Sequence, residues 1–370
     1  MKKIIAAGHI CIDITPIFKD SEAKDIGSVL KPGKLIETGK AEVSTGGSVA
    51  NTGLAMKKLG ADVTLMGKVG KDEFGDMICG ILKKYDAEAG MIRSEKVSTS
   101  YSVVLAIPGI DRIFLHNPGA NDTFCAADVM DDSLEGVSLF HFGYPTLMKS
   151  MYKNDGEELV SLFEKVKSKG IATSLDLSAV DPDSEAGKVN WERVLTKVIP
   201  YVDFFVPSVE ELCFMLDRNR FDEWQNRANG QDITEVIEVE DVAPLANKCL
   251  ELGAKVLLVK CGAKGMYLRT ADNDSLKDIG DVVKNSDSWA NLNIFEKSYV
   301  PTRVLSGTGA GDTSIAAFLV SILNGESPRM CLHLAAGTGA SCVEAYDALS
   351  GLRSFDELKA KINAGWEKYN

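Results

Sequence analysis

Leu305-Ser306-Gly307-Thr308-Gly309-Ala310-Gly311-Asp312-Thr313 is a glycine-rich turn that leads into an apolar pattern of helical type at 315–320. Such a turn leaves backbone N–H groups without helical acceptors, and the helix dipole adds partial positive charge there. The backbone of Gly309, Ala310 and Gly311 is therefore predicted to form an anion site. Asp312 falls in the first helical turn, where its carboxylate could take a proton from a hydroxyl group. The structural alternative is a tight turn in which Asp312 only complements the dipole.

A second glycine-rich stretch lies far upstream, where residues 46–60 read G-G-x-x-x-N followed by seven residues and L-G. Gly46 and Gly47 lack a Cβ, which allows a substrate to approach the backbone closely. Asn51, one helical turn later, offers both a donor and an acceptor to a pair of hydroxyl groups. Asp13 follows an apolar run at 3–12 that predicts a strand, and open α/β sheets bind ligands at the carboxyl ends of strands. A turn-forming aspartate is the alternative at that position.

In this order and at this separation, the two stretches resemble the PfkB (ribokinase-like) family of sugar and nucleoside kinases, and the resemblance covers nearly the whole chain. It implies an α/β protein with a three-layer α/β/α ribokinase-like fold, a mainly parallel central sheet and a small β lid, in a single kinase domain over 1–370. It also implies ATP-dependent transfer of the γ-phosphoryl group to a hydroxyl of a small sugar or sugar-like substrate. The implied site residues are Asp312 as base, Gly309, Ala310 and Gly311 as anion hole, and Asp13, Gly46, Gly47 and Asn51 as substrate contacts.

The resemblance also places the nucleotide. Residues 260–265, Lys-Cys-Gly-Ala-Lys-Gly, follow an apolar strand pattern and resemble the loop on the nucleotide side of the family's site. The expected nucleotide contacts are Lys260, Gly262, Gly265 and Thr308. An ordinary turn with solvated lysines is the alternative.

The expected cofactors are ATP and Mg²⁺, and Glu211 is the implied metal-linked residue. The family has a glutamate at this place that orders waters on the Mg²⁺ bound to the nucleotide phosphates. Ser208, where the family has Asn, and Glu211 are also spaced as a capping box, which is a purely structural device. Both roles are compatible with the sequence.

The chain departs from the family pattern in two places. Ser306 and Gly307 replace an Asp-Thr pair that often helps to hold a monovalent cation, so a requirement for K⁺ is left open. Asp176 stands where many sugar kinases have D-x-N-x-R, but no Asn or Arg follows at that spacing. An arginine from this loop is therefore not expected at the phosphates.

Two segments, about 14–44 and 98–118, are polar with short alternating pieces and are predicted to form the lid. Some members of the family dimerise through this lid, so a homodimer is one expectation. Between 139 and 260, apolar strands alternate with amphipathic helices, which predicts βαβ units and a parallel sheet. Two long polar segments, 217–240 and 270–298, are predicted to be surface insertions without an interpretable motif.

The composition excludes several classes of partner. The chain has 53 acidic and 41 basic residues, a net charge of −12, which argues against nucleic acid and against an anionic membrane surface. No apolar run reaches transmembrane length. The eight cysteines form no C-x-x-C pair and no zinc spacing, which favours reduced thiols in a cytoplasmic protein.

Two other functions stay open. One is a nucleoside kinase on the same scaffold, which a stacking aromatic from the lid, Tyr101 or Phe114, would favour. The other is a non-catalytic binding or scaffold relative, whose mark would be the loss of Asp312, and that residue is present. The residues alone do not identify the acceptor, the hydroxyl that is phosphorylated, or the oligomeric state.

Overall fold

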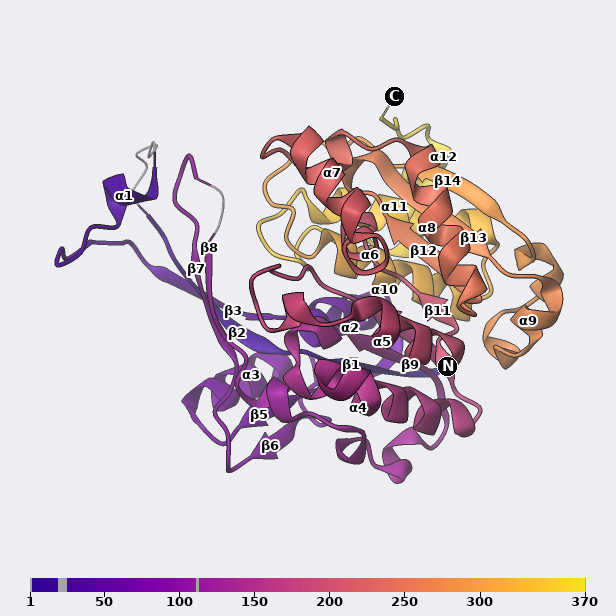
Figure 1. The fold of residues 1–370 in the computed structure, drawn as a ribbon, viewed down its shortest axis with the longest axis horizontal. Coiled ribbons are helices and arrows are strands. Elements are labelled where there is room, and N and C mark those ends of the chain that lie inside the picture. Colours follow the sequence, from indigo (N-terminus) through magenta and orange to yellow (C-terminus); the bar gives the residue numbers. More distant parts are fainter. Residues whose placement is uncertain (1, 19–24, 111–112, 370) are drawn as a thin grey trace.

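The computed structural model describes residues 2–18, 25–110 and 113–369. A central sheet carries helices on both faces, and a thin second sheet projects from one end of it, on the left of Figure 1. The strands of the central sheet are β1 (Lys3–Gly8), β4 (Asp62–Met66), β9 (Val137–Gly143), β10 (Ala172–Asp176), β11 (Phe204–Phe205), β12 (Val256–Lys260), β13 (Gly265–Thr270) and β14 (Asn293–Lys297). Their order is β14-β13-β12-β11-β10-β9-β1-β4, and among these described strands only β13 runs opposite to the others, pairing antiparallel with β12 and β14. The predicted three-layer α/β/α ribokinase-like fold is confirmed.

Two apolar cores lie on the two faces of this sheet. Because both faces are covered, the parallel strands are almost continuously apolar, and alternate residues of β1 belong to opposite cores: Ile4 and Ala6 to one, Ile5 and Ala7 to the other. The first core is covered by α2 (Ser48–Lys58), α3 (Glu73–Lys83), α9 (Asn273–Lys277), α10 (Ala310–Leu323), α11 (Pro328–Cys342) and α12 (Phe355–Asn363). The second is covered by α4 (Lys149–Ser168), α5 (Trp191–Val198), α6 (Val209–Leu216), α7 (Arg218–Ala228) and α8 (Val239–Glu251).

The single strand predicted for 3–12 is wrong in its extent. Gly8 has φ 127°, and a Cβ there would stand 2.2 Å from the carbonyl oxygen of Gly143, so the chain leaves the central sheet at this point. It continues as β2 (Cys11–Pro16) in the second sheet. His9 and Ile10 form the link, which brings His9 to the edge of the sheet where ligands bind.

The prediction that 217–240 and 270–298 are surface insertions is also wrong. Phe221, Trp224 and Ala228 lie at helical spacing along α7 and are buried in the second core. The second segment supplies β14 at the edge of the central sheet, and Trp289 beside it is buried. A helix can pack against the core with only a few apolar residues when all of them lie on one of its faces.

The second sheet has the strand order β3-β2-β7-β8, with β3 (Ala41–Gly46), β7 (Tyr101–Leu105) and β8 (Ile113–Asn117) beside β2. All four strands fall within or at the edge of the two expected lid segments, although 19–24 and 111–112 of those segments lie outside the described residues. One cross-strand row aligns Ser44, Asp13, Ser102 and His116. The next row, on the opposite face, aligns Val43, Ile14, Val103 and Leu115. The lid therefore has one polar and one apolar face.

The remaining elements are short: α1 (Ile26–Val29) in the lid, and β5 (Lys68–Gly70) paired with β6 (Ile92–Ser94). Within the described ranges, none of the helices combines the length and the apolar character that crossing a membrane requires.

Candidate active site

Asp312 lies in the first turn of α10 and is buried beneath three side-chain donors. Asn51 Nδ2 donates to Oδ2 across 3.0 Å, and Thr52 Oγ1 donates to Oδ1 across 3.1 Å. The hydroxyl of Tyr144 lies 2.9 Å from both carboxylate oxygens. Burial raises the pKa of Asp312, while the charge of Lys260 and these donors act in the opposite direction. A carboxylate with a raised pKa is a stronger proton acceptor than an exposed one.

The glycine-rich turn sits directly before this carboxylate. Gly309 is the N-cap of α10 with φ 75°, and a Cβ there would come within 2.3 Å of Ala348 Cβ, so both backbone and space require glycine. The N–H of Ala310 donates to Gly307 O at 3.3 Å. Gly307, Gly309, Ala310 and Gly311 line a cavity of about 530 Å³ that Asp312 also lines. The predicted anion turn thus faces the same space as the predicted base.

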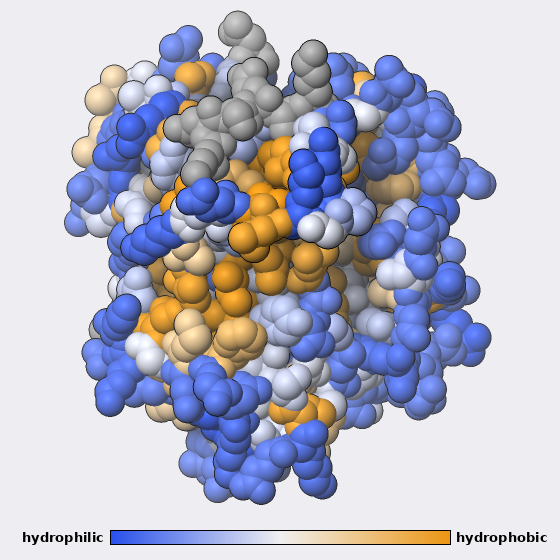
Figure 2. Space-filling model, turned by 90° about the vertical axis from the view of Figure 1, so that its left-hand side faces the viewer, coloured by the Kyte–Doolittle hydropathy of each residue, from blue (hydrophilic) through white to orange (hydrophobic). Residues whose placement is uncertain are grey.

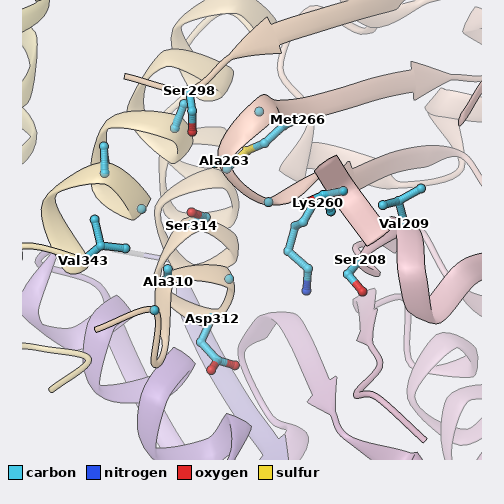
Figure 3. A pocket seen from close by; sticks show the side chains of 18 of the residues that line it. Ser208, Val209, Lys260, Ala263, Met266, Ser298, Ala310, Asp312, Ser314 and Val343 are labelled. Atoms are coloured by element: carbon cyan, nitrogen blue, oxygen red, sulfur yellow. The ribbon is translucent and has the colours of Figure 1, made fainter. Parts of the chain in front are cut away.

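Lys260 enters this cavity from the end of β12, with its side chain directed toward Asp312 in Figure 3. Its Nζ lies 2.7 Å from Asp176 Oδ1, at the end of β10, and both side chains are almost fully buried. A Cβ on Gly311 would stand 3.5 Å from Lys260 Cδ, so the lysine stem runs beside the anion turn. Burial acts to lower the pKa of Lys260, but Asp176 and then Glu211 outweigh it and leave that pKa raised. Lys260 is therefore a buried cation beside the turn.

Glu211 lines the same cavity, and its structural role is evident. Ser208 Oγ accepts from the N–H of Glu211 at 3.2 Å, and Ser208 N donates to Glu211 Oε2 at 2.7 Å, which completes the capping box of α6. Among the described residues, no group of three or more His, Cys, Asp and Glu could hold a metal ion.

The loop 260–265 borders the cavity beyond Lys260. Gly262 and Gly265 line the cavity and have φ 57° and 134°, and a Cβ on Gly265 would stand 2.0 Å from Glu296 O. Lys264 turns away, because its Nζ donates to Ile237 O. Thr308, the other predicted nucleotide contact, lies outside this loop, in the turn before α10, and its N–H donates to Ser306 Oγ at 3.1 Å. The loop thus offers backbone and Lys260, not Lys264, to a ligand.

The far end of the cavity is apolar and shaped by small residues of α11. A Cβ on Gly339 would stand 2.4 Å from Ser314 Oγ, so the two helices are in close contact there. The side chains that line this end are Val304, Ala336, Ala340 and Val343. One cavity therefore joins an apolar end, suited to a nucleobase, to a cation and a backbone anion turn, suited to phosphates. These residues fit ATP.

Asp13 lies on the polar face of the lid. A Cβ on Gly46 would stand 2.2 Å from Asp13 Oδ2, and Cys11 Sγ donates to Oδ1 across 3.3 Å. Gly47 has φ 87°, and a Cβ there would stand 2.5 Å from His9 O. Burial raises the pKa of Asp13. The missing Cβ atoms of Gly46 and Gly47 therefore leave room for the Asp13 carboxylate and for His9.

Three rings connect Asp13 to the base. The centroid of His9 is 5.4 Å from that of His116 and 6.3 Å from that of Tyr144. Burial lowers the pKa of His9 to about 3, so its ring is neutral, and both ring nitrogens lack a partner within the described part of the chain. His116 Nδ1 is 3.0 Å from Ser102 Oγ in the polar row of the lid. The side chains between Asp13 and Asp312 thus include a neutral imidazole and hydroxyl groups, which can form hydrogen bonds with an uncharged polyhydroxy ligand.

Sequence reasoning missed Tyr144, Thr52, His9 and His116. Tyr144 follows a buried strand and precedes a proline, and a polar residue at the carboxyl end of a parallel strand was the available signal. Of the two lid aromatics considered, Tyr101 packs against Phe74 with centroids 5.4 Å apart. Phe114 lies on the same face of β8 as His116, because the two residues are two positions apart.

Comparison with known proteins identifies the family. The sequence matches the model of the pfkB family of carbohydrate kinases over residues 1–354. The chain belongs to this family. Its family is one of ATP-dependent phosphotransferases with a hydroxyl acceptor.

Among curated pfkB relatives, an uncharacterized sugar kinase of Archaeoglobus fulgidus is 26% identical over 308 residues, covering 82% of this chain and 100% of the relative. Fructokinase-2 of Oryza sativa subsp. japonica is 25% identical over 362 residues, covering 94% and 90%. Two solved structures share the fold. Arabidopsis thaliana ribokinase, complexed with ribose and ATP, has a TM-score of 0.69 at 20% identity and coverages of 97% and 98%. A putative ribokinase II of E. coli, complexed with ATP and Mg²⁺, has a TM-score of 0.68 at 20% identity and coverages of 98% and 100%.

Proposed function

We propose that this pfkB kinase transfers the γ-phosphoryl group of ATP to a hydroxyl of a small sugar, with Asp312 as the base. The observation that carries the proposal is the shared cavity, in which Asp312, the turn 309–311 and Lys260 face one another. In phosphoryl transfer the protein contributes mainly positioning and charge stabilisation. Asp312 accepts the proton of the attacking hydroxyl, and the N–H groups of Gly309 and Gly311 stabilise charge on the transferred group. The N–H of Ala310 joins them when it exchanges its bond to Gly307 O for one to the phosphoryl group.

Lys260 is the proposed side-chain cation for the phosphates of ATP. Its ammonium is already buried and held by Asp176 at 2.7 Å, so little reorganisation is needed to neutralise phosphate oxygens beside the turn. Gly262, Gly265 and Thr308 are the other proposed contacts of the nucleotide. Mg²⁺, when bound to the phosphates, neutralises their charge, and Glu211 is the proposed partner of its waters. A potassium series belongs in the same assays, because Ser306 and Gly307 leave that requirement open.

Asp13, Asn51 and the backbone at Gly46 and Gly47 are the proposed contacts of the acceptor. A sugar is favoured over an anionic acceptor, because the residues described around this space are carboxylates, amide, hydroxyls and the neutral His9. A nucleoside is the second candidate. Phe114, which is 56% exposed on the polar face of the lid, is the observation that favours it, because a nucleobase could stack there.

The proposed enzyme works as one domain over 1–370, with lid segments of about 14–44 and 98–118 over the acceptor. The opposite face of the lid is apolar, and Figure 2 shows apolar residues gathered on this side of the molecule. Val43 and Leu115, from the apolar row, are 40% and 55% exposed. A second copy of this lid is the proposed partner, and sedimentation of Leu115→Glu beside Phe114→Glu, its neighbour on the polar face, checks this. Only Leu115→Glu should shift a dimer to monomers.

We also place the reaction in the cytoplasm, where ATP is abundant. All eight cysteines are free thiols, as expected of a protein in a reducing compartment.

The test of the proposed function is a screen of neutral sugars, polyols and nucleosides for ADP release with Mg²⁺ and ATP. The expected result is turnover with at least one neutral sugar, and turnover lower by about 10²–10⁴-fold in the Asp312→Asn variant. Turnover with nucleosides alone would select the second candidate. Nucleotide binding without turnover for any acceptor would instead select the non-catalytic relative.

A further inference from the structure

Tyr144 is the donor to Asp312 that comes from neither glycine-rich stretch. It follows β9 with φ 65° and ψ 44°, in the left-handed region, which is uncommon for a residue with a large side chain. Its backbone is held on both sides: Tyr144 N donates to Asp176 O at 3.3 Å, and Leu147 N donates to Tyr144 O at 3.1 Å. Strained backbone of this kind is concentrated at functional sites, where the surrounding structure enforces it. The left-handed backbone at Tyr144 thus directs its phenol toward Asp312.

The phenol occupies the edge of Asp312 that a reacting hydroxyl needs. A carboxylate offers about four lone-pair directions, and Asn51 and Thr52 each take one, on different oxygens. The Tyr144 hydroxyl lies 2.9 Å from both oxygens, so it uses the remaining directions, and Tyr144 and Asp312 both line the cavity. A general base must reach the proton that it removes within hydrogen-bond distance. The acceptor hydroxyl and the Tyr144 hydroxyl therefore compete for the same place.

We propose that Tyr144 is a positioning residue whose hydroxyl holds the place of the acceptor hydroxyl on Asp312 in the free enzyme and yields it when the acceptor binds. The proposal rests on the proposed function, in which Asp312 is the base. A hydroxyl has one proton, so its bond to two oxygens is divided, whereas an acceptor hydroxyl can make one straight bond to one oxygen. No covalent bond of Tyr144 is made or broken. Its phenol stays protonated, because burial and then the charge of Asp312 raise its pKa well above the ordinary range.

The exchange predicts a specific pattern in the pH dependence. A donor to the anionic form of a carboxylic acid lowers its pKa, so removing the Tyr144 hydroxyl raises the pKa of Asp312 in the free enzyme. The base must be deprotonated, so the acid limb of kcat/KM, which reports the free enzyme, moves to higher pH. In the acceptor complex Tyr144 has already left Asp312. The acid limb of kcat, which reports that complex, therefore stays where it is.

The experiment compares wild type with Tyr144→Phe, which keeps the ring and removes only the hydroxyl. Tyr152→Phe is the matched control, because Tyr152 packs against Trp191 with centroids 6.1 Å apart, outside the cavity. Steady-state rates are measured from pH 5 to 9 with ATP, Mg²⁺ and D-ribose or D-fructose, whichever the wild type phosphorylates. We expect the acid limb of kcat/KM to rise by about one pH unit in Tyr144→Phe alone, with an unmoved limb for kcat. Movement of both limbs means that Tyr144 stays on the base, and movement of neither means a structural role; either result overturns the proposal.

A second measurement needs no acceptor. Carbon-13 titration of the Asp312 carboxyl, assigned by comparison with Asp312→Asn, should show a pKa about one unit higher in free Tyr144→Phe than in the wild type. An unchanged value overturns the proposal even if the acceptor screen fails. Failure of the proposed function shows itself separately, as absence of turnover in the wild type. If Tyr144→Phe does not fold, Tyr144→Asn, which tolerates left-handed backbone and has no phenol, is used in both measurements.

Discussion

Asn51 on α2 donates a hydrogen bond to Asp312 on α10, across 3.0 Å and 261 residues of sequence. The two glycine-rich stretches therefore meet at a single carboxylate, because α2 and α10 pack against each other. The amide nitrogen of Asn51 donates to Asp312, and its amide oxygen can still accept a hydrogen bond. The asparagine thus both orients the proposed base and can contact a sugar hydroxyl. This contact therefore joins the two stretches in one site.

Replacing Asp312 with Asn should abolish most activity without unfolding the protein. The amide oxygen can still accept from Asn51, and the hydroxyls of Thr52 and Tyr144 can reverse to accept from the new amide group. The basicity is lost, so kcat should fall by about 10²–10⁴-fold. Thermal melting and nucleotide binding, measured in parallel, should stay close to wild type. Turnover within a few-fold of wild type would remove Asp312 from the role of base.

Replacing Asp13 with Ala should weaken acceptor binding alone. Asp13 lies on the polar face of the lid, away from the cavity that fits the nucleotide, and its loss leaves acceptor hydroxyls unpaired. The expected cost is about 1–3 kcal/mol in acceptor affinity, measured by calorimetry with the acceptor found in the screen. Thr15→Ala, two positions along the same strand and face, is the control. An equal loss of nucleotide affinity would indicate that Asp13 supports the fold instead.

Replacing Lys260 with Met should cost both stability and nucleotide affinity. Asp176 would then be a buried carboxylate without its partner at 2.7 Å, and breaking such a pair typically costs about 3–5 kcal/mol. The double variant Lys260→Met with Asp176→Asn should regain most of the stability in urea unfolding, because the unpaired charge is gone. Its nucleotide affinity should stay weak if Lys260 binds phosphates. Recovery of both properties would assign the pair to the fold alone.

Replacing Glu211 with Gln separates its two roles. Gln can also complete a capping box with Ser208, so α6 and the melting temperature should be preserved. The carboxylate charge is lost, so the Mg²⁺ concentration required for half-maximal activity should rise about tenfold, within the 10–100-fold range typical of residues that act through a metal's outer shell. Ser208→Ala tests the cap by itself. An unchanged Mg²⁺ requirement in Glu211→Gln would leave Glu211 only its capping role.

His9 and His141 should each contribute a loss of stability below pH 6.5. Burial lowers the pKa of His9 and of His141 to about 3 in the folded protein, from an unfolded value of 6.5. The unfolded chain therefore binds protons first, so stability that is present above pH 6.5 is lost as the pH falls toward 3. Each histidine contributes a slope of about 1.4 kcal/mol per pH unit in that window. Urea unfolding at pH 7, 6 and 5 measures the slope.

Variants of single histidines test whether His9 and His141 cause this loss of stability in acid. His9→Gln and His141→Gln should each reduce the acid slope, because glutamine does not titrate. His333→Gln, at a partly exposed site beside Glu296, should retain it. A slope that survives in both His9→Gln and His141→Gln would assign the acid sensitivity to other groups.

Local chemistry allows the sequence alone to predict the glycine turn before α10 and the carboxylate in its first helical turn. Gly309 and Asp312 are neighbours in the chain, and a glycine turn before a helix has the same exposed N–H groups in any fold. The same holds for the capping box of Ser208 and Glu211. The layered α/β architecture followed from alternating apolar strands and amphipathic helices, since each must bury its apolar side. The end of β1 at Gly8 was not predicted, because it depends on the carbonyl of Gly143, far away in the chain.

Only the tertiary structure decided which side chains surround Asp312. Tyr144 is separated from Asp312 by 168 residues, and Lys260 from Asp176 by 84, so no local pattern pairs them. Their meeting follows from the strand order, which places the carboxyl ends of β9, β10 and β12 along one edge of the sheet. Sequence determines which groups a chain can offer. Burial and strand order determine which of them lose water together, and it is that shared loss of water that turns separate polar side chains into one site.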